Sequence, residues 1–406
     1  MIIQQINTTL RTAAPGRIAE EIGEILVETG HTSYIGYGRK LRPSASKLIK
    51  IGSGFDQSLH GITTRLFDMH GFGSRFATVR FVKKVSLINP DLIHLHNLHG
   101  YYLNIEVLFN YLKKIQKPVI WTLHDCWPFT GHCSYFDYVG CNKWKSECYS
   151  CPNRMAYPRS LVVDNSRVNF IKKKHLFSGL EKLTFVAPSA WMAGLLKQSF
   201  LSDYPVEIIH NGVDVNVFRP SRQREKLKHR YGVSGRNVIL GVASIWDRRK
   251  GLSDFIKLSS MLSEDQVIIL VGLKKSQIKD LPGNVIGIRR TESVNDLAEL
   301  YSMADVFVNP TFVDNFPTTN IEALACGTPV ITYRTGGSPE AVDDNTGLIV
   351  EKGDVKRLFE SINKTLDVGK GVYEDLCRKR AVENFNKLSK NTEYIRLYES
   401  VLSNRF

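Results

Sequence analysis

The sequence has no apolar run that approaches the ~20 residues of a membrane-spanning helix. Its opening, MIIQQINTTLRTAAPG, has neither the basic n-region nor the long apolar h-region of a signal peptide. We therefore expect a cytoplasmic protein. Signatures of zinc fingers, RRM domains and helix-turn-helix motifs are also missing, so we expect no binding of nucleic acid.

Acidic residues are the scarcer charged class. Lys and Arg number 54 against 40 Asp and Glu, which gives a net charge of +14. Such an excess favours phosphorylated ligands, nucleic acid or an anionic membrane, without choosing among them. With 43% hydrophobic and 23% charged residues the chain is expected to fold. Its 406 residues exceed one ordinary core, so two domains are predicted.

Short β-rich runs alternate with helical patterns along the chain. Most of these runs are continuously apolar, which is typical of parallel strands buried on both faces. The predicted fold class is therefore α/β, with doubly wound parallel sheets. The predicted strands are 2–6, 33–37, 92–95, 119–123, 184–187, 206–209, 238–243, 267–271, 285–288, 306–309, 330–332 and 348–350.

A change of character near Asn211–Pro220 marks the predicted domain boundary. Asn211-Gly212 is a turn signal, and Pro220 ends the preceding segment before a charged stretch. We expect one domain over 1–210, a second over 211–385, and a final helix over 386–406 that returns to the first domain. Sheets of this kind bind ligands at the carboxyl ends of their strands, so the site is expected between the domains.

Two carboxylates stand in the segment VDNFPTTNIEALACGTPVIT, residues 313–332. Asp314 lies in the loop after a predicted strand, and Glu322 lies in the first turns of a helix that starts near Thr318 or Thr319. A helix start suits a phosphate or a sugar hydroxyl. In a purely structural alternative, Thr319 and Glu322 form a capping box and Asp314 closes a turn.

The segment resembles a known motif. D-x7-E followed by ALACGTPV is similar to the E-x7-E region of retaining glycosyltransferases of family 4, which have the GT-B fold. Five further motifs follow the family's order: DLIHLHN (91–97), WTLHDCW (121–127), HNGVD (210–214), RRKGL (248–252) and TGGSPEAV (335–342). The resemblance covers nearly the whole chain. It implies two Rossmann-like domains that face a cleft, the first on the acceptor side and the second binding the nucleotide sugar.

The resemblance also implies roles for individual residues. Glu322 would hold the ribose hydroxyls, Lys250 would neutralise the diphosphate, and His124 would contact the donor sugar. Gly16 and Gly337 would let the backbone approach the ligand closely. The implied catalytic residues are His124, Asp314 and Lys250, and the implied donor-binding residues are Gly16, Arg249, Lys250, Asn315, Phe316, Pro317, Thr318, Glu322 and Gly337.

The activity that the resemblance implies is retaining transfer of a sugar from a nucleotide diphosphate sugar, of hexosyltransferase type. The acceptor would be a glycan, lipid-linked in the family, and the setting bacterial O-antigen, capsule or exopolysaccharide synthesis. Neither a protein nucleophile nor a catalytic metal is expected. Two alternatives stay open: a GT-B-shaped sugar-nucleotide 2-epimerase, and a sugar-nucleotide-binding protein with little turnover.

The chain departs from the family pattern at three places. Asp314 is one methylene shorter than the usual Glu, and Ile245 stands where the family has an Arg. Arg248 or Arg249 would supply that charge, and we favour Arg249. The loop TAAPGR replaces the usual Gly-Gly near Gly16.

A cysteine-rich loop, 126–152, follows His124. Cys133, Cys141, Cys148 and Cys151 are spaced C-x7-C-x6-C-x2-C. In a reducing compartment this cluster favours a structural zinc site, while free thiols or disulfides are the alternatives. Further cysteine and histidine side chains that could substitute as ligands are Cys126 and His132. The loop resembles an insertion found in members of the family tied to polysaccharide assembly.

The segment Ser74–Ile88 is basic and amphipathic. Its apolar side would carry Phe76, Val79, Val82 and Val85, with Arg75, Lys83 and Lys84 elsewhere. Such a helix can lie on an anionic membrane, which would make the protein peripheral on the inner face of the cytoplasmic membrane. The alternative is a core helix with a solvated basic face.

Overall fold

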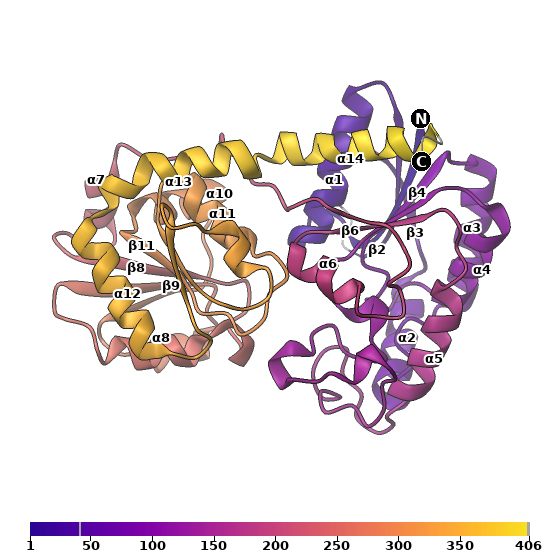
Figure 1. Ribbon diagram of the computed structural model, residues 1–406, viewed down its shortest axis with the longest axis horizontal. Coiled ribbons are helices and arrows are strands. Elements are labelled where there is room, and N and C mark those ends of the chain that lie inside the picture. The colour runs from indigo at the N-terminus through magenta and orange to yellow at the C-terminus, as the bar shows by residue number, and fades with distance from the viewer. Residues whose placement is uncertain (40–41, 404–406) are drawn as a thin grey trace. The chain divides into compact units, whose positions relative to one another are not determined.

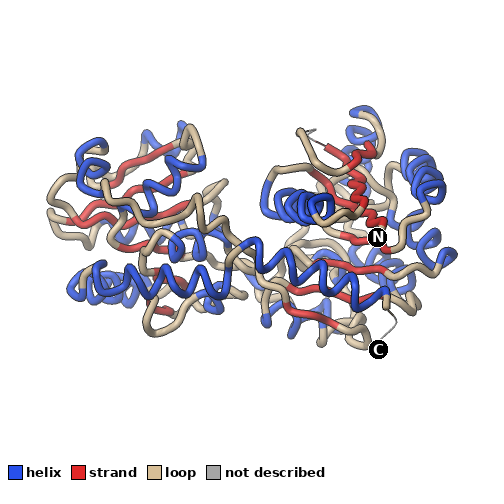
Figure 2. Tube along the Cα trace, turned by 90° about the horizontal axis from the view of Figure 1, so that it is seen from above, coloured by secondary structure: helices blue, strands red, loops and turns tan. Residues whose placement is uncertain are grey.

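The computed structural model describes residues 1–39 and 42–403. Contacts between Cα atoms divide the chain into two compact units. Unit 1 contains residues 1–209 together with the chain from Asn391 onward, and unit 2 contains His210–Lys390. In each unit a parallel sheet has helices on both faces (Figures 1 and 2).

Unit 1 is built on a seven-stranded parallel sheet, as far as the chain is described, with the order β3-β2-β1-β4-β5-β6-β7. The edge strand β3 was not predicted, because its sequence KLIK is short, begins and ends in lysine and is only half buried. The strands are β1 (Ile2–Thr9), β2 (Thr32–Arg39), β3 (Lys47–Lys50), β4 (Leu92–Leu95), β5 (Val119–Thr122), β6 (Leu183–Ala187) and β7 (Val206–Ile208).

Helices cover both faces of this sheet. Apolar side chains of α1 and α14 pack with Ile3 and Leu92 on one face, and those of α3, α4 and α5 pack with Ile93 and Trp121 on the other. The helices are α1 (Ala13–Glu28), α2 (Gly54–Phe67), α3 (Arg75–Ile88), α4 (Ile105–Ile115), α5 (Ser166–Phe177), α6 (Ala190–Leu196) and α14 (Lys387–Leu402), with 3-10 turns η1 (Trp127–Phe129), η2 (Asp137–Val139) and η3 (Lys143–Lys145).

Unit 2 is built on a six-stranded parallel sheet, within the described residues, with the order β10-β9-β8-β11-β12-β13. Its strands are β8 (Asn237–Val242), β9 (Gln266–Val271), β10 (Val285–Ile288), β11 (Val306–Asn309), β12 (Val330–Tyr333) and β13 (Gly347–Val350). Its helices are α7 (Arg224–Arg230), α8 (Leu252–Ser259), α9 (Lys275–Lys279), α10 (Val294–Met303), α11 (Thr318–Ala325), α12 (Val355–Val368) and α13 (Lys370–Phe385), with 3-10 turns η4 (Arg248–Lys250) and η5 (Ser338–Ala341).

The apolar runs of unit 2 explain its layers. In β9, Val267 and Ile269 join the core beneath α10, α11 and α13, while Ile268 and Leu270 join the core beneath α8 and α12. Successive side chains of a strand point to opposite faces, so a strand covered on both faces must be apolar throughout. This confirms the predicted α/β class, and all twelve predicted strands are present.

The helix α3 forms over the predicted segment Ser74–Ile88 and contributes to the core of unit 1. Phe81 and Val85 are buried in the core of unit 1, whereas Arg75, Lys83 and Lys84 are exposed. On the predicted apolar side Val85 is buried but Phe76 is 79% exposed, so contact of this helix with a membrane stays a prediction.

No helix in the described part of the chain combines the length and the apolar character needed to cross a bilayer.

Candidate functional site

The predicted donor-binding residues of unit 2 come from the carboxyl ends of three adjacent strands. Lys250 follows β8, Asp314 follows β11, and the loop with Gly336 and Gly337 follows β12. The strand order reverses beside β8, since β9 lies on one side of it and β11 on the other. Ligands of doubly wound sheets bind at such a switch point.

The loop after β8 holds Lys250 in a defined place. The Asp247 carboxylate accepts a hydrogen bond from the Lys250 N–H at 3.1 Å. Gly251 has φ +76°, and a Cβ there would lie 2.1 Å from the Pro310 carbonyl oxygen, so only glycine fits this crossing. The Phe312 N–H donates to the Arg249 carbonyl at 2.8 Å, which joins this loop to the loop after β11.

Lys250 and Asp314, the two residues that the resemblance places at the chemistry in unit 2, form an ion pair between Nζ and Oδ2. Their side chains are 20% and 17% exposed, so the pair is screened from bulk water without being sealed. An ammonium held in this way is positioned before a ligand arrives. It presents its remaining N–H donors to an anion.

The buried carboxylate of Glu322 lies within α11. Its Oε2 accepts a hydrogen bond from the Tyr301 hydroxyl at 3.0 Å. The capping box between Thr319 and Glu322 is not formed, because α11 begins at Thr318 and its N-cap residue, Pro317, has no side-chain cap. The prediction of a capping box at Glu322 is therefore wrong. Its carboxylate has acceptor capacity beyond the single Tyr301 bond.

The glycine-rich loop after β12 packs directly on Asp314. The Gly337 N–H donates to the Asp314 carbonyl at 3.2 Å. Gly336 has φ +54°, and a Cβ there would stand 1.8 Å from the same carbonyl oxygen. A side chain at Gly336 would therefore displace the backbone that carries Asp314.

The start of α11 brings the remaining predicted donor residues together. Asn315, Phe316 and Pro317 are buried, and Thr318 begins the helix. The Asn211 side chain donates to the Phe316 carbonyl at 3.0 Å, which ties the HNGVD motif to this segment. The N–H groups of the first turn of a helix carry partial positive charge and suit an anion.

The structure distinguishes the two residues that were predicted to replace the missing family arginine, Arg248 and Arg249. Ile245 is 59% exposed, and Arg248 is exposed. Arg249 is only partly exposed, and its Nη1 donates to the Val313 carbonyl at 3.4 Å, next to Asp314. Arg249 therefore lies nearer to the candidate site residues than Arg248 does, in line with our preference.

A second constellation lies at the carboxyl ends of β4 and β5 in unit 1. His96 Nε2 pairs with Gln5 Oε1 at 3.0 Å, and His96 Nδ1 pairs with His124 Nε2 at 3.1 Å. Gln5 uses its amide N–H to reach the Ala19 carbonyl at 2.8 Å, so its oxygen must accept from His96 Nε2–H. His96 Nδ1 is then an acceptor, His124 Nε2–H is the donor, and the lone pair of neutral His124 lies on Nδ1.

The surrounding protein also keeps His124 neutral. Burial of most of the ring lowers the pKa of His124 to about 4, and the nearby Asp125 carboxylate offsets only part of this effect. The pKa of His96 lies well below its ordinary value, again mainly through burial. At neutral pH the pair therefore offers a hydrogen-bond acceptor and no positive charge.

Sequence reasoning missed the partners of Asp125. Its Oδ2 pairs with His99 Nε2 at 2.6 Å, and His99 Nδ1 pairs with the Tyr157 hydroxyl at 3.1 Å. Burial acts to raise the pKa of Asp125, but His99 and the Trp127 N–H hold it below its ordinary value. Tyr157 is distant in sequence from His99, and no local motif indicated that the two side chains would meet.

Gly16 lies in the first turn of α1 rather than in the preceding loop. A Cβ at this position would stand 2.9 Å from the Thr9 carbonyl oxygen, at the end of β1. The glycine is thus required by helix–strand packing, and its predicted contact with a ligand stays a prediction.

Comparison with known proteins agrees with this arrangement. The model of Glycosyltransferase Family 4 matches residues 16–217, and that of Glycosyl transferases group 1 matches residues 236–367. A protein of Escherichia coli (strain K12) named as a colanic acid biosynthesis glycosyl transferase, WcaC, is 25% identical over 99% of this chain and 100% of its own length. A GDP-mannose-dependent phosphatidylinositol monomannoside mannosyltransferase of Corynebacterium glutamicum is 29% identical over 46% of this chain and 53% of its own length.

Solved structures share the fold. Sucrose-phosphate synthase from Thermosynechococcus elongatus has a TM-score of 0.74 at 17% identity, over 99% of both chains. HepE from Anabaena, in complex with UDP-glucose, has a TM-score of 0.68 at 15% identity, over 98% of this chain and all of its own. With both family models matched in chain order, this protein is a glycosyltransferase that belongs to glycosyltransferase family 4 and has the GT-B fold.

Proposed function

We propose that this glycosyltransferase moves a sugar, with retention of configuration, from a nucleotide diphosphate sugar to a glycan acceptor in bacterial surface polysaccharide synthesis. One observation carries the proposal. Lys250, Asp314 and the first turn of α11 meet at the switch point of the unit 2 sheet, with the acceptor Glu322 in the same helix.

In this proposal Lys250 and the start of α11 bind the diphosphate. When the bond between sugar and phosphate breaks, negative charge grows on the departing phosphate oxygens. A cation already held by Asp314 stabilises that charge without reorganising, which lowers the barrier. Arg249 adds a second positive charge at the edge of the loop.

The two carboxylates recognise hydroxyl groups. Glu322 can accept from both ribose hydroxyls while Tyr301 holds its orientation. Asp314 and the backbone of 315–318 take the hydroxyls of the donor sugar. His124 supplies its Nδ1 lone pair to a sugar hydroxyl, since His96 fixes the other ring nitrogen.

The relatives support the setting of the proposal. WcaC is named for colanic acid biosynthesis, and the Corynebacterium glutamicum enzyme for mannosyl transfer to a lipid-linked inositol monomannoside. HepE is described with UDP-glucose. We therefore propose a hexosyl donor and a lipid-linked glycan acceptor. All these matches are glycosyltransferases, so the 2-epimerase alternative is not favoured.

The first test measures donor binding. Purified protein is exposed to a panel of UDP-, GDP- and ADP-sugars, and both the thermal shift and the slow release of free nucleotide are recorded. We expect one donor to stabilise the protein. Glu322→Ala and Lys250→Ala should abolish the shift, whereas Glu264→Ala and Lys279→Ala, which remove exposed residues of the same types in unit 2, should keep it.

The outcomes are separable. A donor that stabilises the protein and is hydrolysed supports an enzyme. A donor that binds without hydrolysis and without transfer to any acceptor favours the binding protein that has lost turnover. Equal shifts in all four variants would show that the donor binds elsewhere.

We further propose that unit 1 binds anionic membranes and that α2 supplies the apolar contact. Phe55, Leu59, Ile62 and Leu66 recur along α2 at helical spacing, and all are exposed. Next to the end of this helix, the exposed segment 161–162 is fixed by a hydrogen bond from Leu161 N–H to the α2 backbone. An exposed apolar stripe on a chain of net charge +14 fits an anionic lipid surface.

Flotation with vesicles tests this proposal. Binding to phosphatidylglycerol vesicles should weaken in high salt and should be lost in a Phe55→Ser/Leu59→Ser double variant. The matched control is Leu87→Ser, which removes an exposed leucine of α3 and should float like the wild type. Absence of wild-type flotation, or equal binding by both variants, would refute the role of α2.

A further inference from the structure

The loop between β5 and α5 has little regular structure to support it. In the described chain its only helical elements are the 3-10 turns η1, η2 and η3, and no strand lies between Val119–Thr122 and Ser166–Phe177. The loop nevertheless supplies Asp125 and Tyr157 to the constellation around His99. Loops of this length keep one conformation only when packing or a cross-link fixes them.

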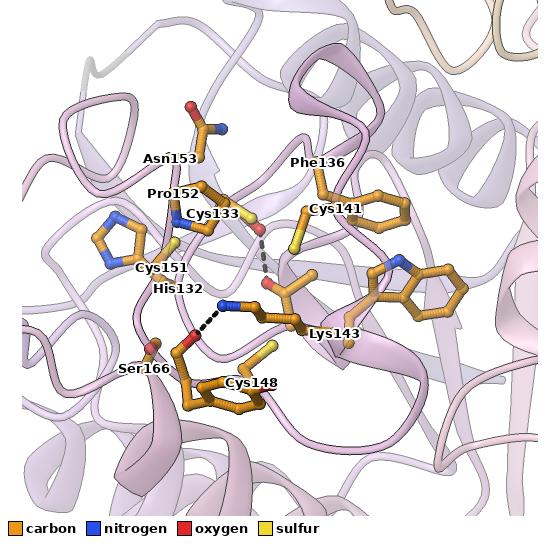
Figure 3. Close-up of a pocket in the computed structure, with 13 residues that line it drawn as sticks. His132, Cys133, Phe136, Cys141, Lys143, Cys148, Cys151, Pro152, Asn153 and Ser166 are labelled. Carbon is orange, nitrogen blue, oxygen red and sulfur yellow. Dashed lines mark hydrogen bonds between the residues drawn. The ribbon is translucent and has the colours of Figure 1, made fainter.

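Four cysteine side chains of this loop line one cavity. The space between their side chains, including the solvent at its mouth, is about 320 Å³. Figure 3 shows Cys133, Cys141, Cys148 and Cys151 around this space, with His132 at its wall. All seven cysteines of the chain, each in the described part, are free thiols.

Contacts link the sulfurs to one another and to backbone N–H groups. Cys133 and Cys151 are hydrogen-bonded side chain to side chain. The Gly131 N–H donates to Cys148 Sγ at 3.2 Å, and the Asn153 N–H donates to the Cys151 sulfur. Both of these N–H groups are therefore directed at sulfur atoms of residues that line the cavity.

A buried ammonium lies behind this cavity. Lys173 is 1% exposed, and its Nζ donates to the carbonyls of Trp127 at 2.8 Å and Thr130 at 3.0 Å. The acidic side chains near its Nζ are Cys148, Asp68, Cys133 and Asp125. A buried cation whose hydrogen bonds go to neutral carbonyls is costly unless negative charge lies nearby. A zinc centre with four thiolates carries a net charge of −2, which would offset it.

We propose that Cys133, Cys141, Cys148 and Cys151 bind one structural Zn²⁺ as four thiolates. Binding releases one proton from each thiol to solvent, and no atom is oxidised or reduced. As the side chains stand, no three His, Cys, Asp or Glu residues of the described chain form a set that holds a metal ion. Metal binding therefore requires the four sulfur atoms to move closer to one another.

His132 is the competing ligand. Its Nδ1 pairs with Asp68 Oδ1 at 2.5 Å, and its buried Nε2 has no hydrogen-bond partner in the described structure. A histidine oriented by a carboxylate is a common zinc ligand. However, its ring is already held by Asp68, which is itself fully buried. We assign it to positioning the loop through Asp68.

The test measures metal in the full-length protein, purified without chelators. Mass spectrometry should find about one zinc per chain after dialysis against EDTA, as expected for a closed four-thiolate site. Serine at any of the four positions should lower the zinc content several-fold. His132→Gln, and alanine at the buried Cys326 or Cys377 of unit 2, should retain it.

Several results would overturn the proposal. Wild-type protein that contains no zinc would indicate free thiols instead. A count of fewer than seven thiols in protein unfolded under non-reducing conditions would indicate disulfides. If His132→Gln loses zinc and Cys141→Ser retains it, the ligands are His132 and the other three cysteines rather than four thiolates. For variants that fail to fold, absorption of Co²⁺-substituted wild-type protein reports the thiolate ligands directly. None of these measurements depends on the proposed transferase activity.

Discussion

At the residue scale, Glu322 illustrates how a tertiary contact decides between two local interpretations. Its spacing from Thr319 fits a capping box, but the helix begins two residues too early, and the Tyr301 hydroxyl donates to the carboxylate instead. Tyr301 lies 21 residues away, so the local sequence could not reveal this partner. The family motif indicates only that the Glu322 carboxylate has a function, because it assigns a role to this glutamate.

Glu322→Gln is predicted to weaken donor binding about 10- to 100-fold, because hydrogen bonds to a charged acceptor contribute about 1.5–3 kcal/mol. Calorimetry with the donor identified by the panel measures the change. Tyr301→Phe removes one orienting bond and should cost less. If Glu322→Gln binds the donor like the wild type, the ribose role of Glu322 is wrong.

His124 gives a prediction about pH. Because burial lowers its pKa to about 4, His124 stays neutral across the range above pH 5. His124→Asn should lower kcat on the order of 100-fold, as loss of a positioned polar group does. The acid limb of the wild-type pH–rate profile between pH 5 and 7 should persist in the variant. Disappearance of that limb would mean that His124 titrates there and acts by proton transfer.

At the element scale, the glycines at crossings of loops have the clearest physical reasons. Gly336 combines positive φ with contact to the Asp314 carbonyl, and neither could be known before the loops after β11 and β12 were placed side by side. Gly336→Ala should lower the melting temperature by several degrees and weaken donor binding, because strain and overpacking together cost about 1–3 kcal/mol.

Gly371→Ala provides the matched control for this substitution. Gly371 lies in α13, and a Cβ there would meet nothing within 4 Å. Alanine at such a helical position should leave stability unchanged or raise it by up to about 1 kcal/mol. Equal destabilisation by both substitutions would show that the contact at Asp314 is unimportant.

The elements themselves were largely predictable. Buried strands such as β8 and β9 are continuous apolar runs, so their existence and type follow from composition alone. The edge strand β3 has no such run and was missed. For α3 the sequence showed an amphipathic helix but not which side faced the core, because burial depends on neighbours distant in sequence. The same limit hid His99 and Tyr157.

At the scale of the whole molecule, unit 1 contains an unusual set of neutral buried histidines. Burial lowers the pKa of His60 to about 4, and it lowers the pKa values of His70, His94 and His96 well below the ordinary value. Their rings bond to neighbours inside the unit, for example His94 to Thr122 at 2.8 Å. The unfolded chain takes up protons at these positions near pH 6.5, while the folded chain does so only at a much lower pH.

The protein should therefore lose stability as the pH falls from about 6.5 toward 5, because the unfolded state binds more protons in this range. The loss is on the order of 1–2 kcal/mol for each such histidine, which is large against a total stability of about 5–15 kcal/mol. Urea unfolding at several pH values measures the slope. His96→Gln should flatten it, whereas His175→Gln, at an exposed position, should not. A stability independent of pH across this range would contradict the neutral core histidines.

The central claim concerns the whole enzyme: it transfers a sugar with retention from a nucleotide diphosphate sugar. The most direct measurement incubates the protein with the donor found by the panel and a lipid-linked glycan acceptor, then determines the product by mass spectrometry and its anomeric configuration by NMR. The account predicts a glycosylated acceptor with the configuration of the donor, and a loss of about 100-fold or more in kcat for Lys250→Ala. An inverted product, or transfer that is unaffected by Lys250→Ala, would contradict it.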